Sequence, residues 1–172
     1  MSQDFNLNGK VAIVTGGGRG IGKAIALGLA EAGAEVAVAS RTLDDLEKVA
    51  LEIQKLGRKS LAIKADLTLM DDIVNLAAKV KAHFGRIDIL VNNSARSFMR
   101  SLFDFKEDGW DKIFDTNVKG LFFLSREVAK IMKDQNGGRI INITTAGAEK
   151  ASPMLGPYHT SKAAVKMLTK CM

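Results

Sequence analysis

The stretch Val11-Ala-Ile-Val-Thr-Gly-Gly-Gly-Arg-Gly-Ile-Gly22 decides the fold, because it joins a short β-branched run to a cluster of glycines. The run Val11–Thr15 is typical of a buried strand, and the periodic apolar residues that begin at Ile21 are typical of a helix with one buried face. Glycines between a strand and a helix permit a tight turn and leave several amide groups pointing outward at the positive end of the helix dipole. We therefore expect a cradle for a pyrophosphate.

The residues of this glycine turn restrict the class of ligand that it could bind. Glycine lets a phosphate approach the backbone, so we expect the cofactor-binding residues of the turn to be Gly16, Gly18, Arg19, Gly20, Ile21 and Gly22. The turn lacks the lysine and the serine or threonine of a nucleotide-hydrolysing loop, which argues against ATP or GTP hydrolysis. The alternative is a turn that only packs the strand on the helix.

The rest of the chain continues the alternation of strand and helix. Short β-branched runs predict strands at residues 11–15, 35–39, 60–64, 87–91 and 139–143. Apolar residues at three- and four-residue intervals predict helices over residues 21–32, 43–56, 71–84, 118–133 and 158–172. Such an alternation predicts an α/β fold, a Rossmann-like doubly wound parallel sheet in three layers (α/β/α). We find no repeat and no linker, so residues 1–172 are expected to form one Rossmann-like domain.

Composition and charge exclude several classes of protein. The chain has 172 residues, of which 47% are hydrophobic and 26% charged, as in an ordinary globular domain. Its net charge of +6 could suit nucleic acid, but the basic residues are scattered among acidic pairs such as Asp44-Asp45. We expect no nucleic-acid partner.

The sequence also bears on location and on metals. The N-terminus carries an acid and no long apolar run, so it resembles neither a secretion signal nor a transit peptide, and no stretch is apolar enough for a membrane span. The single cysteine, Cys171, has no partner for a disulfide. A cytoplasmic protein without membrane contact is therefore expected. His83 and His159 have no second ligand at a metal spacing, so no metal site is predicted.

The end of the second predicted strand bears on the choice of cofactor. An acid there would bind the ribose hydroxyls of NAD, but this chain has Ser40-Arg41. Arg41 and Arg19 could instead flank a 2′-phosphate, because a guanidinium matches its geometry and charge. We therefore expect NADP(H) to be preferred over NAD(H). For either arginine the alternative is an ordinary solvated charge.

The only tyrosine of the chain, Tyr158, lies four residues before Lys162. On a helix this interval places both side chains on one face. A nearby ammonium lowers the pKa of a phenol and moves it toward acid–base chemistry at neutral pH. The pair therefore predicts a proton donor for a carbonyl oxygen.

Taken in order, the motifs resemble those of the short-chain dehydrogenase/reductase family. They are Thr15-Gly-x-x-x-Gly20-Ile-Gly22, Asp66-Leu67, Asn92-Asn93-Ser94-Ala95, Asn117, Thr145 and Tyr158-x-x-x-Lys162. Within the family the chain looks most similar to 3-oxoacyl-acyl-carrier-protein reductases and glucose-dehydrogenase-like members. The resemblance implies an NAD(P)-dependent oxidoreductase that transfers a hydride between nicotinamide and a small carbonyl or alcohol substrate.

The resemblance also implies residue roles. Tyr158 would be the catalytic acid/base, Lys162 would lower its pKa and bind the nicotinamide ribose, and Thr145 would orient the substrate oxygen. Asn117 would support a proton-relay water. Further cofactor contacts would come from Ser40, Arg41, Asp66 and Leu67 (the last two at the adenine) and from Asn92 in the cleft. The family associates through the helices around residues 118–133 and 158–172, which implies a homo-oligomer.

Three departures from the family pattern leave an alternative open. Threonine occupies position 145 where serine is usual, and Ala95 replaces a glycine. Family members also continue beyond the tyrosine helix through further strands and a substrate-covering loop, so we expect C-terminal strands to be absent from this chain. The alternative is therefore a dinucleotide-binding protein without catalysis.

Overall fold

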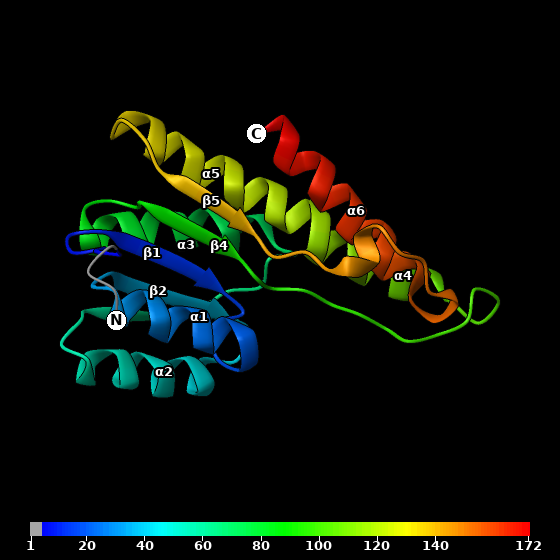
Figure 1. Cartoon of the computed structure of the whole chain (residues 1–172), viewed down its shortest axis with the longest axis horizontal. Coiled ribbons are helices and arrows are strands. Elements are labelled where there is room, and N and C mark those ends of the chain that lie inside the picture. Colours follow the sequence, from blue (N-terminus) through cyan, green and yellow to red (C-terminus); the bar gives the residue numbers. More distant parts are fainter. Residues whose placement is uncertain (1–4) are drawn as a thin grey trace.

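The computed structural model describes residues 5–172. Residues 1–4 lie outside this range, and the prediction that the N-terminus carries no targeting signal falls partly on them. Five parallel strands form one sheet in the order β3-β2-β1-β4-β5 (Figure 1). The strands are β1 (Val11–Thr15), β2 (Glu35–Ser40), β3 (Ser60–Lys64), β4 (Ile89–Asn92) and β5 (Arg139–Asn142). The predicted doubly wound α/β fold is confirmed.

Helices cover both faces of the sheet. They are α1 (Gly20–Glu31), α2 (Leu43–Lys55), α3 (Met70–Phe84), α4 (Glu107–Phe114), α5 (Leu121–Asp134) and α6 (Gly156–Cys171). One hydrophobic cluster packs α1 and α2 against the sheet, and another packs α3 and α5 against the opposite face. α6 contacts α4 and the end of β5. The three layers follow from the way that each crossover returns over the sheet.

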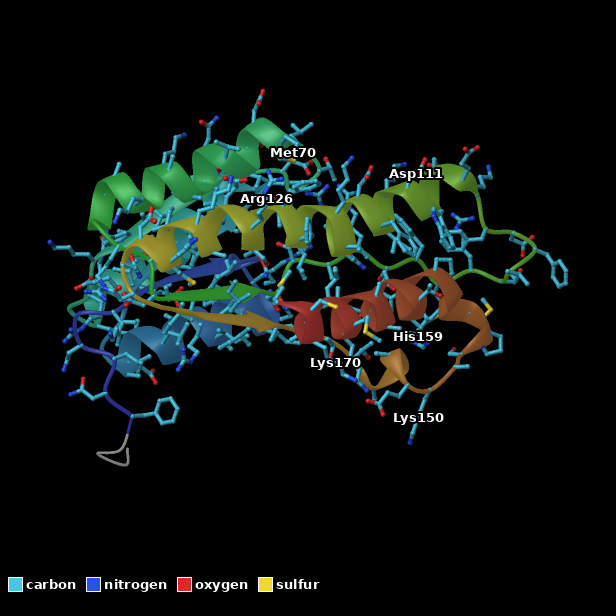
Figure 2. All side chains as sticks on the ribbon, turned by 90° about the horizontal axis from the view of Figure 1, so that it is seen from above. Met70, Asp111, Arg126, Lys150, His159 and Lys170 are labelled. Carbon is cyan, nitrogen blue, oxygen red and sulfur yellow. The ribbon has the colours of Figure 1, made fainter. Side chains whose placement is uncertain are left out.

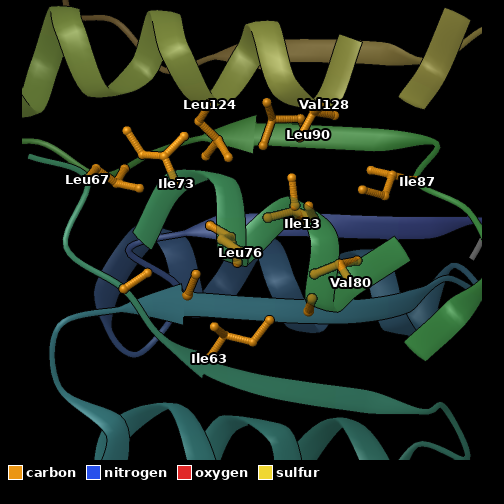
Figure 3. Close-up of a cluster of buried hydrophobic side chains, with 14 of the residues drawn as sticks. Ile13, Ile63, Leu67, Ile73, Leu76, Val80, Ile87, Leu90, Leu124 and Val128 are labelled. Atoms are coloured by element: carbon orange, nitrogen blue, oxygen red, sulfur yellow. The ribbon is translucent and has the colours of Figure 1, made fainter. Parts of the chain in front are cut away.

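Figure 3 shows the core on the α3 and α5 face. Ile13 and Leu90 project from neighbouring strands, and α3 and α5 cover them with Ile73, Leu76, Val80, Leu124 and Val128. All of these side chains are fully buried. Burial of one such side chain contributes roughly 1.5–3 kcal/mol, so this layer fixes the strands whose carboxyl ends form the site.

Most predicted elements begin and end within two residues of their observed bounds, and two of the differences have a clear structural cause. The fourth strand begins at Ile89 instead of residue 87, because the side chain of Gln135 binds both backbone groups of Ile87. The helix predicted over residues 118–133 begins much earlier, at Glu107, and runs through a π-helical segment, Asp115–Gly120, into α5. A π-helical turn changes the spacing of apolar residues, so a 3.6-residue pattern detects only the part beyond it.

A buried carboxylate joins the amino ends of the two central strands. Asp88 is 7% exposed; it accepts hydrogen bonds from the Val11 N–H at 3.0 Å and from Arg86 at 2.6 and 2.7 Å. Burial raises the pKa of Asp88, but the Arg86 and Val11 hydrogen bonds and the charges of Arg86 and Lys10 outweigh it and hold the pKa below its ordinary value. The ionised carboxylate thus stabilises the β1–β4 pair.

Candidate active site

A cavity of about 400 Å³ opens at the carboxyl ends of the strands. Its walls come from the glycine turn after β1, the end of β2 and the segments after β3 and β4, and Thr116 closes it from the π-helical segment. Parallel α/β sheets bind ligands at this edge. All of the predicted glycine-turn residues line this cavity, namely Gly16, Gly18, Arg19, Gly20, Ile21 and Gly22.

The glycine turn is held tightly against the segment that follows β4. Gly16 has a φ of +64°, and a Cβ there would come 2.8 Å from the amide nitrogen of Asn93. A Cβ on Gly22 would overlap the Gly16 carbonyl. The Thr15 hydroxyl accepts hydrogen bonds from the Asn93 and Ser94 N–H groups at 3.0 and 3.1 Å. Glycine is therefore required at position 16 by its positive φ and by the close approach of Asn93, and at position 22 by close backbone approach alone.

The cavity wall carries basic side chains near the end of β2, where the 2′-phosphate contacts were predicted. Ser40 and Arg41 line it beside Arg19, and Arg41 is exposed. Asp45 lines the same region, an acid that the sequence reasoning missed because it belongs to the first turn of α2 rather than to the end of β2.

Asp66 and Leu67 lie where the adenine contacts were predicted. Both line the cavity, and the Asp66 carboxylate accepts hydrogen bonds from the N–H and hydroxyl of Thr68 at 3.0 and 2.8 Å. Burial raises the pKa of Asp66, but the Thr68 bonds and the charges of Arg41 and Arg96 hold it below its ordinary value. Asp66 is thus ionised at neutral pH.

Asn92 lies behind the cavity instead of in its wall. The Asn92 side-chain amide donates to the Ser125 hydroxyl at 2.9 Å and to the side-chain oxygen Oδ1 of Asn142 at 2.8 Å. Asn92 is 2% exposed. Its neighbour Asn93 lines the cavity. The side chains of a strand alternate between faces, so a one-residue step decides which asparagine meets a ligand. Asn93 rather than Asn92 therefore lines the cavity, and Asn92 as a cofactor contact stays a prediction.

The predicted catalytic residues lie on a second group of elements. Asn117 belongs to the π-helical segment, Thr145 follows β5, and Tyr158 and Lys162 lie on α6. None of the four lines the 400 Å³ cavity, among the residues that the structure describes. Figure 1 shows that these elements extend from the carboxyl edge of the sheet, so the second group lies at the same edge as the cavity.

Asn117 connects the two groups. It is completely buried, and its side-chain amide donates to the Arg96 carbonyl at 2.9 Å and to the Ser161 hydroxyl at 3.0 Å. Its carbonyl oxygen accepts from the Arg96 N–H at 2.7 Å. Ser161 in turn donates to the Tyr158 carbonyl at 2.7 Å. This chain of bonds links the segment after β4 to the tyrosine helix; the position of Ser161 carried no signal in the sequence.

Lys162 is held by the end of β5. Its ammonium donates to the Ile143 carbonyl at 2.7 Å, and the residue is only 2% exposed. Burial lowers the pKa of Lys162. Lys162 and Tyr158 share one helix, as the spacing predicted, but within residues 5–172 no hydrogen bond joins the two side chains.

Thr145 and His159 meet around one short turn. The Thr145 hydroxyl accepts a hydrogen bond from the Gly147 N–H at 3.3 Å. The His159 ring lies so close to Gly147 that a Cβ there would overlap it. Figure 2 places His159 on α6 beside the loop that carries Lys150. The turn after β5 thus contacts Thr145 through the Gly147 N–H and contacts α6 through the His159 ring.

Several cavity residues have no counterpart among the predicted contacts. They are Thr42, Asp45, Ala65, Asn93, Ser94, Ala95, Arg96 and Thr116. Asn93, Ser94 and Ala95 stand inside a motif quoted for the family, so their neighbourhood was recognisable. Arg96 and Thr116 both line the cavity, and Asn117, the neighbour of Thr116, bonds to the Arg96 backbone.

Residues 5–172 contain no group of three or more histidine, cysteine, aspartate or glutamate side chains that could hold a metal ion. In the same residues, no helix combines the length and apolarity needed to cross a membrane.

Comparison with known proteins identifies the family. The sequence model of the short chain dehydrogenase family matches residues 10–172. The chain belongs to the short-chain dehydrogenase/reductase family. The family consists of oxidoreductases that use a nicotinamide dinucleotide, so the family prediction and the coarse cofactor prediction are confirmed.

The most similar proteins are named dehydrogenases and reductases. Gluconate 5-dehydrogenase of Gluconobacter oxydans is 38% identical over 98% of this chain and 66% of its own length. A 3-oxoacyl-[acyl-carrier-protein] reductase of Staphylococcus epidermidis is 40% identical over 94% of this chain and 66% of its own length. The structure of a short-chain alcohol dehydrogenase from Sinorhizobium meliloti has a TM-score of 0.94 at 39% identity, covering 97% of this chain and 66% of that one. The chain thus spans about two thirds of the length of these relatives.

Proposed function

We propose that this protein transfers a hydride between NADP(H) and a small carbonyl or alcohol substrate, with Tyr158 as the general acid/base. The observation that carries the proposal is the Asn117 bridge. It joins the segment that lines the nucleotide cavity, through Ser161, to the helix that bears Tyr158 and Lys162. The bridge supports a single site with a nucleotide part and a proton-transfer part.

The nucleotide part fits a dinucleotide phosphate. The residues of the glycine turn line an open cavity at the N-terminus of α1, and a pyrophosphate is stabilised by backbone amides at a helix N-terminus. Arg19 and Arg41 supply positive charge where a 2′-phosphate would lie. Asp66 and Leu67 form the wall for the adenine. These features favour NADP(H) over NAD(H).

The proton-transfer part fits carbonyl chemistry. When bound, the nicotinamide supplies or accepts the hydride. In reduction, the Tyr158 hydroxyl gives its proton to the carbonyl oxygen, and the Thr145 hydroxyl holds that oxygen by a second hydrogen bond. On α6, Lys162 lies one turn beyond Tyr158 and would bind the nicotinamide ribose, and a water beside Asn117 would return the proton to Tyr158.

The surface of the helices supports a homo-oligomer. α5 exposes Phe122 and α6 exposes Met167, both large apolar side chains. We propose association through residues 118–133 and 158–172, with all 172 residues acting as one domain.

A second candidate is a dinucleotide-binding protein without turnover. It is favoured by the observation that Asn117, Thr145, Tyr158 and Lys162 all lie outside the cavity wall. Both candidates require the nucleotide part, and turnover of a carbonyl substrate separates them.

Titration with NADPH and NADH, followed by cofactor fluorescence, tests the nucleotide part. NADPH should bind more tightly, because one charge-assisted arginine–phosphate contact contributes about 1.5–3 kcal/mol, roughly ten- to a hundredfold in Kd. Arg41→Ala should remove most of this preference and leave NADH binding nearly unchanged. Arg100→Ala, which alters an arginine outside this cavity, is the matched control. Equal affinity of the unaltered protein for both cofactors would refute the NADP(H) preference.

A further inference from the structure

Arg96 is a third arginine in the wall of the nucleotide cavity. Its backbone is fixed on both sides by Asn117, which accepts from its N–H at 2.7 Å and donates to its carbonyl at 2.9 Å. Within residues 5–172, no hydrogen bond or ion pair engages its guanidinium. The structure thus holds the backbone of Arg96 in place and leaves its charged group for a ligand.

The position of Arg96 relative to the glycine turn defines which part of a ligand it can meet. The segment that leads to Arg96 lies directly on the turn, since Asn93 donates to the Thr15 carbonyl at 3.0 Å and Gly16 leaves no space for a Cβ beside Asn93. In the sheet, β1 lies between β2 and β4. The turn after β1 is therefore flanked by Arg41 on the β2 side and by Arg96 on the β4 side.

Arg96 and Asp66 line the same cavity, although they follow strands on opposite sides of β1. Asp66 follows β3, and Arg96 follows β4. Burial raises the pKa of Asp66, and the charges of both Arg41 and Arg96 act in the opposite direction. Positive charge from both sides of the glycine turn therefore acts within the cavity.

Asp66 does not need Arg96 as a structural partner. Its carboxylate is already bound by the N–H and hydroxyl of Thr68, at 3.0 and 2.8 Å, and no ion pair joins it to Arg96 among the described residues. The Arg96 guanidinium therefore remains available to a group of opposite charge in the middle of the cavity.

We propose that Arg96 binds the pyrophosphate of the dinucleotide from the β4 side, opposite the amides of the glycine turn. The proposal deepens the proposed function and rests on it. A guanidinium presents a planar fork of donors that matches two phosphate oxygens. Because NADH and NADPH share the pyrophosphate, Arg96 contributes to affinity for both cofactors, whereas Arg41 contributes to the choice between them.

Isothermal titration of the 172-residue chain with four nucleotides tests this division of roles. ADP carries the pyrophosphate alone, 2′-AMP carries the 2′-phosphate alone, and NADH and NADPH complete the set. Arg96→Gln should weaken binding of ADP, NADH and NADPH by a similar factor, about tenfold or more, and leave 2′-AMP unchanged. Arg96→Lys, which keeps the charge but loses the fork, should bind ADP with an intermediate affinity.

Arg100→Gln is the matched control, because it removes an arginine of the same loop that lies outside this cavity. It should bind all four nucleotides as the unaltered chain does. Two results would overturn the role of Arg96: unchanged ADP affinity in Arg96→Gln, or a loss confined to NADPH and 2′-AMP. A failure of the unaltered chain to bind any of the four would overturn the proposed function itself, and so the two failures are distinguishable.

Discussion

The nucleotide half of the molecule (residues 11–96) and the catalytic half (residues 107–172) are built by different forces. Every residue of β1 is buried, and apolar side chains pack on both faces of the sheet around it. β5 pairs only with β4, and its Ile141 is 46% exposed. Of the four buried residues of α6, two are the polar Ser161 and Lys162.

This difference shows how the two parts of the site are positioned. The glycine turn is set by a core that excludes water on both faces of β1, a non-directional but large contribution. α6 is set mainly by individual hydrogen bonds, from Asn117 to Ser161, from Lys162 to Ile143, and from Asn142 to Thr169. Such bonds are directional and suit the placing of proton-transfer groups, but each contributes only about 1 kcal/mol.

Tyr158→Phe is expected to give the largest difference between the two halves, because it should affect turnover and not cofactor affinity. The substitution removes only the hydroxyl on α6, so NADPH affinity should stay the same while turnover falls by about 10²–10⁴-fold in any form of the protein that turns over. Steady-state NADPH oxidation with small ketones and 3-oxoacyl thioesters measures the loss. A residual rate above about one tenth would show that the phenol is not the proton donor.

A smaller effect, on stability alone, is expected from Asp88→Asn in the nucleotide half. The substitution removes the carboxylate that binds Arg86 and the Val11 N–H at the amino ends of β1 and β4, opposite the cavity. The free energy of unfolding should fall by about 2 kcal/mol at neutral pH, with nucleotide affinity unchanged. Urea denaturation measures the difference, and Asp108→Asn, which breaks an exposed ion pair with Lys112, is the control.

The loss of stability in Asp88→Asn is expected to depend on pH. The pKa of Asp88 is lowered in the folded protein, so its stabilisation is present above the ordinary carboxyl range and is lost as pH falls through the lowered folded value. The stability difference between the unaltered protein and Asp88→Asn should therefore persist from neutral pH to mildly acidic pH and shrink below it. A difference that grows on acidification would contradict this assignment.

The smallest effect is expected from Thr169→Val in the catalytic half. The Thr169 hydroxyl accepts a hydrogen bond from the Asn142 side-chain amide at 2.9 Å. This bond joins the end of β5 to the last turns of α6. Its loss should lower the free energy of unfolding by about 1 kcal/mol. Thr160→Val is the control, since the Thr160 hydroxyl bonds only within α6. If both variants lose the same stability in thermal unfolding, hydrogen bonds between elements do not hold α6, and the comparison of the two halves fails.

The sequence predicted well those features that depend on local periodicity. The glycine turn, the alternation of strands with helices and the common helix of Tyr158 and Lys162 all follow from spacing along the chain. The π-helical segment escaped prediction because its altered spacing interrupts the helical pattern, and it carries Asn117. A motif fixes the strand end to within a residue but not the face that each side chain meets, so it could not show that Asn93 lines the cavity and Asn92 lies behind it.

Residue types and their near-neighbour spacing were sufficient to predict the family, the parallel sheet and the candidates for phosphate binding and proton transfer. Which of those residues meet depends instead on the tertiary structure. Thr15 with Asn93, Asn117 with Arg96 and Ser161, and Lys162 with the end of β5 are all separated by many residues along the chain. Such contacts arise when the core fixes strand order and crossover geometry, and that order places Arg96 beside the glycine turn.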